Sequence, residues 1–261
     1  IGLFSVCPLI QHSQYSAAFL PSACLFLVFS LPCFLFVRDA AQKTEKKALL
    51  PLLKQEVQKL AGTIRAIRSS KPALRFFCAI LLAINGINGI LLNMGVYAKK
   101  VIGFTDTELP LFIAGGAVFA FGSSLAFGFI VERIGAKRTL AYVLCGWVVA
   151  LSVVSMVVQK SLFWIISPCM GILLAGTWVS SRPLVISLSP KHRVGEFFGF
   201  TGLASITGAF ISPLLWLFVI TAFESYGVLK YRIAVRVLAV MIAFGFFVLR
   251  GVPEQKLLEE F

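Results

Sequence analysis

Charged residues are scarce in this chain, and acidic residues are scarcer than basic ones. Only 13% of the 261 residues are charged, with 11 acidic against 24 basic residues, whereas 59% are hydrophobic. Most charges fall in short clusters that are separated by apolar stretches of about 20 residues, the length of helix that crosses ~30 Å of hydrocarbon. This pattern excludes an ordinary soluble domain and predicts a helical protein that crosses a membrane several times.

Groups that catalyse reactions or bind metals are also rare. The two histidines, His12 and His192, lie outside the apolar stretches, and the six cysteines form no CxxC pair. No glycine-rich phosphate loop is present, and no pair of carboxylates lies within an apolar stretch. We therefore expect no enzyme, no cofactor and no metal site, and the cysteines indicate no redox compartment.

The formal charge of +13 does not indicate a nucleic-acid partner. The basic residues flank apolar stretches instead of forming a solvated patch, as expected of cytoplasmic loops in a membrane protein. The expected partners are the lipid bilayer and a small-molecule solute, without nucleic acid. The chain begins at Ile1 and no signal-peptide pattern precedes its first apolar stretch, so we expect a sequence truncated at its amino end.

Seven membrane spans are predicted from the apolar stretches. They cover residues 17–37, 76–98, 109–131, 139–158, 162–188, 197–223 and 231–249. Most Lys and Arg residues lie in one set of flanking segments, 38–75, 132–138, 189–196 and 250 onward. These segments are predicted to be cytoplasmic, and the odd number of spans places the two chain ends on opposite sides.

The longest connecting segment, 38–75, carries an amphipathic pattern. Apolar residues recur at helical spacing at Leu53, Val57, Leu60, Ile64 and Ile67, with Lys and Arg on the other faces. This predicts a helix that begins near Pro51 and lies along the cytoplasmic membrane surface. A connector helix that packs on the cytoplasmic face of the protein is an equally good interpretation.

The turn between the third and fourth spans has a distinctive set of residues. They are Gly128, Glu132, Arg133, Gly135, Lys137 and Arg138. An acid beside an Arg at a helix end, followed by a glycine and two basic residues, makes a short hairpin whose charges can pair with neighbouring helix ends in one conformation only. An ordinary positive-inside turn is the alternative. The arrangement resembles the signature loop of the major facilitator superfamily.

Three further segments, 31–37, 84–90 and 189–200, resemble the vacuole effluxer family of that superfamily. They look like the end of its sixth helix, its seventh helix and its loop from the tenth to the eleventh helix. The resemblance covers residues 16–252 and implies an all-α membrane protein of about seven transmembrane helices, helices six to twelve of the fold.

The resemblance also implies a domain organisation. Residues 1–37 would end the N-terminal half, with its last helix at 17–37, and 38–75 would be the basic cytoplasmic connector. Residues 76–250 would form the C-terminal six-helix half, and 251–261 the cytoplasmic tail. The remaining N-terminal helices are expected in the same chain or in a separate one.

Two asparagines inside the second span are candidates for the wall of a solute cavity. Asn85 and Asn88 are three residues apart, so they share a helix face, and Gly86 and Gly89 allow another backbone to approach. Amides are costly in lipid, so this face either lines a cavity or bonds to another helix. Members of the resembling family usually carry Asp in place of Asn85, so proton coupling at this position is in doubt.

The fifth and sixth spans carry further polar residues. In the sixth, Thr201, Ser205, Gly208 and Ser212 form a stripe that favours tight helix packing over solute contact. Members of the resembling family usually carry Gly where this chain has Ser212. In the fifth, Arg182 either snorkels to the interface or acts as a gate that pairs with Glu196 in one state. A Ser-Arg pair also occurs there in the resembling family, which supports the gate.

The function that the resemblance implies is secondary transport of a small solute by alternating access, with export of amino acids as the first guess. The alternatives are a non-transporting membrane remnant or scaffold, and a membrane enzyme acting on lipids, which would need an ionisable residue within a span. The expected location is a bacterial inner membrane or a eukaryotic organellar membrane such as that of the vacuole.

Overall fold

The computed structural model describes residues 19–36, 62, 64–65, 67–190 and 193–252, and their regular elements are all helical. The helices are α2 (Phe19–Phe36), α4 (Lys71–Tyr97), the π-helical turn η2 (Ala98–Ile102), α5 (Glu108–Ile134), α6 (Ala136–Met156), α7 (Lys160–Leu188), α8 (Val194–Ala222), the short 3-10 turn η4 (Glu224–Tyr226) and α9 (Leu229–Arg250). The predicted all-α class is confirmed.

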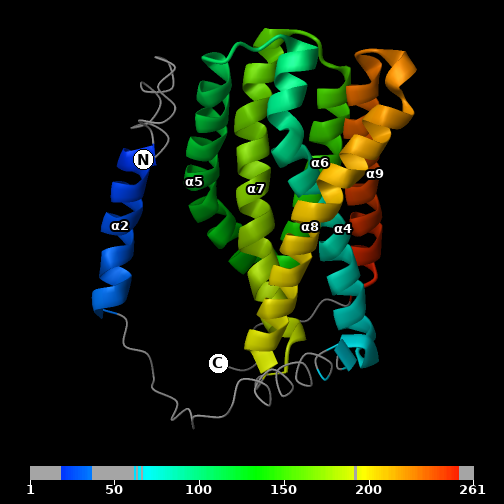
Figure 1. The fold of residues 1–261 in the computed structure, drawn as a ribbon. Helices are drawn as coiled ribbons and strands as arrows, with labels where there is room; N and C mark the ends of the chain where they lie inside the picture. The colour runs from blue at the N-terminus through cyan, green and yellow to red at the C-terminus, as the bar shows by residue number, and fades with distance from the viewer. Residues whose placement is uncertain (1–18, 37–61, 63, 66, 191–192, 253–261) are drawn as a thin grey trace, which may run out of the picture.

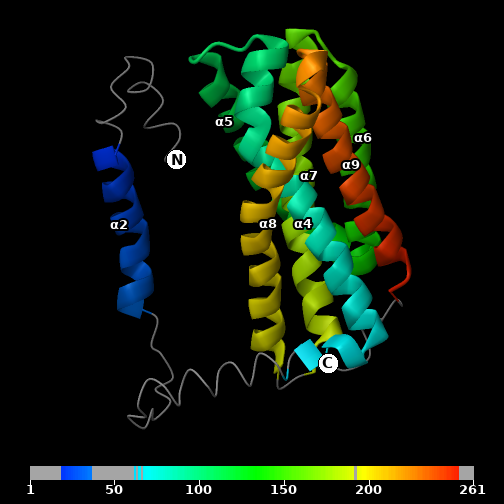
Figure 2. The same cartoon turned by 45° about the vertical axis from the view of Figure 1, so that its right-hand side comes forward.

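Six of these helices, α4 to α9, are long and apolar enough to cross a membrane, against seven predicted spans. The first predicted span, 17–37, corresponds to α2, which has 18 described residues and a shorter apolar stretch, Ala23–Pro32. Figures 1 and 2 both show α2 beside the bundle and separated from it. The six long helices form the bundle.

The packing of the bundle follows the order α5, α7, α6, α9, α4, α8, in which each helix contacts mainly its neighbours. If the labels α4 and α7, α5 and α8, and α6 and α9 are exchanged in this list, the same order results, read in reverse. The bundle is thus built as two three-helix repeats, the internal symmetry found in many secondary transporters. α4 is the most buried long helix and α5 the least.

Small residues let these helices approach closely. A side chain at Gly171 on α7 would collide with the carbonyl oxygen of Gly116 on α5. A Cβ at Gly245 on α9 would lie 2.8 Å from the carbonyl oxygen of Ala79 on α4. The interfaces therefore depend on glycine at the points of contact.

The described parts of the predicted cytoplasmic segments lie at one end of the bundle, drawn at the bottom of Figure 1 and called the basic end below. Arg75, near the start of α4, donates to the Gly251 carbonyl oxygen at 2.7 Å. Lys137, at the start of α6, donates to the Arg250 carbonyl oxygen at 3.4 Å. These bonds join the beginnings of α4 and α6 to the end of α9.

Much of the predicted amphipathic helix, including its start near Pro51, lies outside the described residues. Its described end, from Gly62 to Ser69, is helical at every described position. Ile67 is buried in the core, whereas Arg65 and Arg68 are exposed. Ile67 thus packs on the protein, and both interpretations of the segment stay predictions.

Candidate functional site

The two candidate asparagines lie where α4 crosses α8. Asn88 Nδ2 donates to the carbonyl oxygen of Ser205 at 3.3 Å, and Ser212 Oγ donates to the carbonyl oxygen of Asn85 at 2.6 Å. A Cβ at Gly208 would lie 2.7 Å from Asn88 Nδ2. The polar face of α4 therefore meets the stripe of α8, and the packing predicted for that stripe is confirmed at these positions.

The side chain of Asn85 is only partly satisfied. Its Nδ2 donates to the Leu81 carbonyl oxygen of the same helix at 2.7 Å, while its buried Oδ1 has no hydrogen-bond partner among the described residues. An unmade bond of this kind costs about 1–3 kcal/mol. The amide oxygen is an acceptor open to a donor, so solute contact at Asn85 stays a prediction beside the interhelical contact of its backbone.

A groove follows the interface of α5 with α7. One cavity, of about 280 Å³, is lined by Ala120, Ser124, Leu174, Ala175, Trp178, Val179 and Arg182. A second cavity, of about 220 Å³, shares Ala120 and Leu174 with the first and extends to Phe112 on α5 and Met94 on α4. The two cavities together run along α7 from Ser167 to Arg182, which lies near the basic end of the bundle.

Arg182 is the charged residue of this groove. Its side chain is exposed, and it makes no hydrogen bond or ion pair with the described residues, Glu196 included. The polar neighbours are occupied: Thr177 accepts a hydrogen bond from Trp147 Nε1 at 3.0 Å, and Ser180 donates within its helix. The gate contact between Arg182 and Glu196 stays a prediction for another conformation.

The signature-loop residues lie around a tight turn at the basic end. Gly135 links α5 to α6 with a φ of 89°, a conformation that favours glycine, so this turn forms as predicted. Glu132, Arg133 and Arg138 are exposed, and Lys137 donates to the Arg250 carbonyl oxygen of α9. Space around Gly128 is open, so close packing does not require a glycine there.

The opposite end holds an ionic cap that the sequence analysis did not predict. Glu108 Oε2 accepts from the backbone N–H of Thr105 at 2.9 Å, and Lys160 Nζ lies 2.6 Å from the same carboxylate. Lys99 pairs with Asp106, and Lys160 lies over the ring of Phe104. The Thr105-x-x-Glu108 spacing of a capping box was the available signal.

The sequence reasoning also missed Ser124 and Trp178. Isolated polar and aromatic residues in a span carry no signal of their own, because their role depends on which helix lies opposite.

The profile of the family described as "Vacuole effluxer Atg22 like" matches residues 7–260. A search of curated proteins finds no match. The match spans nearly the whole chain and agrees with the resemblance carried by the three sequence segments. The chain is therefore a multi-pass membrane protein that belongs to the vacuole effluxer Atg22-like family, a family of membrane transporters and not of enzymes.

Proposed function

We propose that this chain forms one half of a secondary transporter that moves a small solute by alternating access, together with an N-terminal half in the same or a separate chain. The observation that carries the proposal is the groove between α5 and α7, which ends at Arg182, a residue with no partner in the described part of the chain. Ionisable groups within membrane spans are costly and mark solute pathways. Little of α5 is buried in the bundle, as expected of a helix that also contacts the other half across a solute pathway.

Amino acids are the solute class that fits this groove best, with export suggested by the family. A guanidinium group binds a carboxylate through charge-assisted hydrogen bonds, so Arg182 would hold the carboxylate of the solute. Leu174, Trp178 and Met94 would contact an apolar side chain farther along the groove. The small cavity volumes favour a solute of amino-acid size over a larger one.

The cytoplasmic gate would form at the basic end. Glu132, Arg133, Lys137 and Arg138 lie at or beside the turn of Gly135, and they would contact a second half in one conformation. Arg182 would exchange the solute carboxylate for Glu196 when the groove is empty. The host membrane would be that of a vacuole or a comparable compartment.

The test is amino-acid counterflow in proteoliposomes that contain the complete transporter. Arg182→Gln should lower the exchange of zwitterionic amino acids about tenfold or more, the effect of one lost charge-assisted bond. The matched control is Arg232→Gln on α9, which does not line the groove. Equal exchange by both variants, with both proteins folded, would contradict the proposal.

A further inference from the structure

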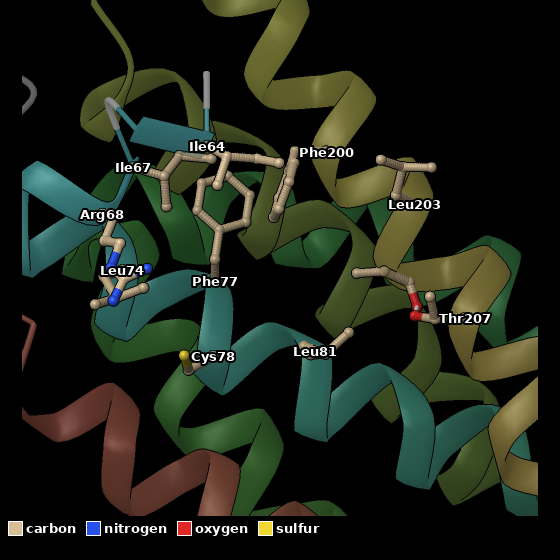
Figure 3. Close-up of a pocket in the computed structure, with 11 residues that line it drawn as sticks. Ile64, Ile67, Arg68, Leu74, Phe77, Cys78, Leu81, Phe200, Leu203 and Thr207 are labelled. Carbon is tan, nitrogen blue, oxygen red and sulfur yellow. Dashed lines mark hydrogen bonds between the residues drawn. The ribbon is translucent and has the colours of Figure 1, made fainter. Parts of the chain in front are cut away.

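A larger cavity lies at the basic end, away from the α5–α7 groove (Figure 3). We call it the lipid-side groove; it has a volume of about 580 Å³ and lies between α4, α8 and the helical residues that precede α4. Leu74, Phe77 and Leu81 form its α4 wall, and Phe200, Leu203 and Thr207 form its α8 wall. Both walls follow the helical spacing i, i+3, i+7.

α4 and α8 meet at several points along the interface that the groove follows. One point is the bond from Ser212 to the Asn85 carbonyl oxygen, and another is the ring contact of Phe77 with Phe200, whose centroids are 5.2 Å apart. The rings are side by side in Figure 3. The residues from Leu74 to Leu81 span about 10 Å along α4.

Water is a poor occupant of this groove. Its walls are almost wholly apolar, and the hydroxyl of Thr207 already donates to the Ala204 carbonyl oxygen at 2.9 Å. An ordered water needs two to four polar partners, which these walls do not offer. The groove is also open, since Leu74, Leu81 and Leu203 are each about 40% exposed. In a bilayer, hydrocarbon would fill it.

Positive charge lies at the mouth of the groove. Arg68 lines the mouth beside Leu74, as Figure 3 shows, and it makes no hydrogen bond or ion pair within the described part of the chain. Arg65 and Lys71 are exposed close to it in the sequence. Arg68 lies two residues before Ser70, the N-cap of α4, and so at the boundary of the membrane span.

We propose that the lipid-side groove binds one acyl chain of an anionic phospholipid from the leaflet at the basic end, with the lipid phosphate held by Arg68. The apolar walls would hold the acyl chain of the lipid. Arg68, which has no partner among the described residues and lies at the level of the headgroups, would favour a negatively charged headgroup. The walls contain few polar groups, and this distinguishes the lipid-side groove from the groove between α5 and α7.

The experiment is photolabelling of the purified full protein with a phosphatidylglycerol that carries a diazirine in its acyl chain, followed by peptide mapping. Labels should concentrate on residues 74–81 and 200–207, and unlabelled phosphatidylglycerol should compete better than phosphatidylcholine with the same chains. Arg68→Gln should reduce that preference about fivefold, the effect of one surface cation. Arg133→Gln, an exposed arginine of the α5–α6 turn, should leave it unchanged.

Two results would overturn the proposal. Labels spread equally over other exposed residues of α8, such as Phe210 and Leu214, would mean ordinary annular lipid. Equal competition by both lipids would mean that Arg68 selects no headgroup. A groove-filling variant, Ala204→Phe, should abolish the concentrated label; if it fails to fold, the comparison of Arg68→Gln with Arg133→Gln still decides the question.

Discussion

The hydroxyl of Ser212 donates to the backbone carbonyl oxygen of Asn85 at 2.6 Å, and this bond joins α8 to α4 where the two helices cross. Ser212 is fully buried there, and a Cβ at Gly89 would lie 3.3 Å from its own Cβ. The crossing therefore combines a hydrogen bond with close backbone contact.

Substitution of Ser212 should separate these two contributions. Ser212→Ala should cost about 0.6 kcal/mol, typical of one interhelical hydrogen bond in a membrane protein. Ser212→Val should cost more, about 1–3 kcal/mol, because it also overfills the interface. Reversible unfolding in mixed micelles measures both. Thr221→Ala is the control, since the exposed hydroxyl of Thr221 bonds only within its own helix; equal effects at both sites would contradict the assignment.

The contact of Gly171 with Gly116 gives a sharper prediction. Gly171→Ala should destabilise the protein by at least ~2 kcal/mol, because the added methyl collides with backbone that cannot move independently. Gly122→Ala on α5 has open space and should be neutral or stabilising, since alanine favours a helix by up to ~1 kcal/mol over glycine. Thermal unfolding of the two variants in detergent tests the difference, and similar melting temperatures would show that α5 and α7 do not meet at this point.

These contacts show where sequence reasoning succeeded and where it stopped. Span lengths are dictated by bilayer thickness, so α4 to α9 could be predicted from the apolar stretches alone. The polar face of Asn85 and Asn88 and the stripe of Ser205 and Ser212 could also be predicted, but only as separate features. Periodicity identifies a face and not the helix that it meets, so their pairing required the structure. The groove beside Arg182 could not be predicted from the sequence for the same reason.

Substitution of Asn85 tests whether its side-chain amide contacts the solute. Asn85→Ala should change the free energy of unfolding by less than about 1 kcal/mol, because the small cavity is offset by removal of a buried oxygen without a described partner. If the interhelical interpretation is right, counterflow by the complete transporter should also be unchanged. Loss of flux in a variant of normal stability would favour the cavity-wall interpretation instead.

The ionic cap at the opposite end should depend on salt. Glu108→Gln keeps an acceptor for the Thr105 N–H but loses the charge that pairs with Lys160. The melting temperature should fall slightly at low ionic strength, and the difference from the wild type should vanish near 1 M salt, where the screening length is about 3 Å. Glu224→Gln, an exposed acid at the same end, should show no difference at any salt concentration.

The signature loop gives the prediction that bears most directly on alternating access. Glu132 and Arg133 are exposed and have no partner among the described residues, so the double variant Glu132→Ala, Arg133→Ala should fold with unchanged stability. Its solute flux should nevertheless fall, because a latch contributes only in the conformation where its charges pair. Lys100→Ala with Glu224→Ala removes one charge of each sign from exposed positions at the opposite end and is the matched control. If flux in the loop variant equals that of the control while both proteins remain folded, the latch is wrong and the loop is an ordinary positive-inside turn.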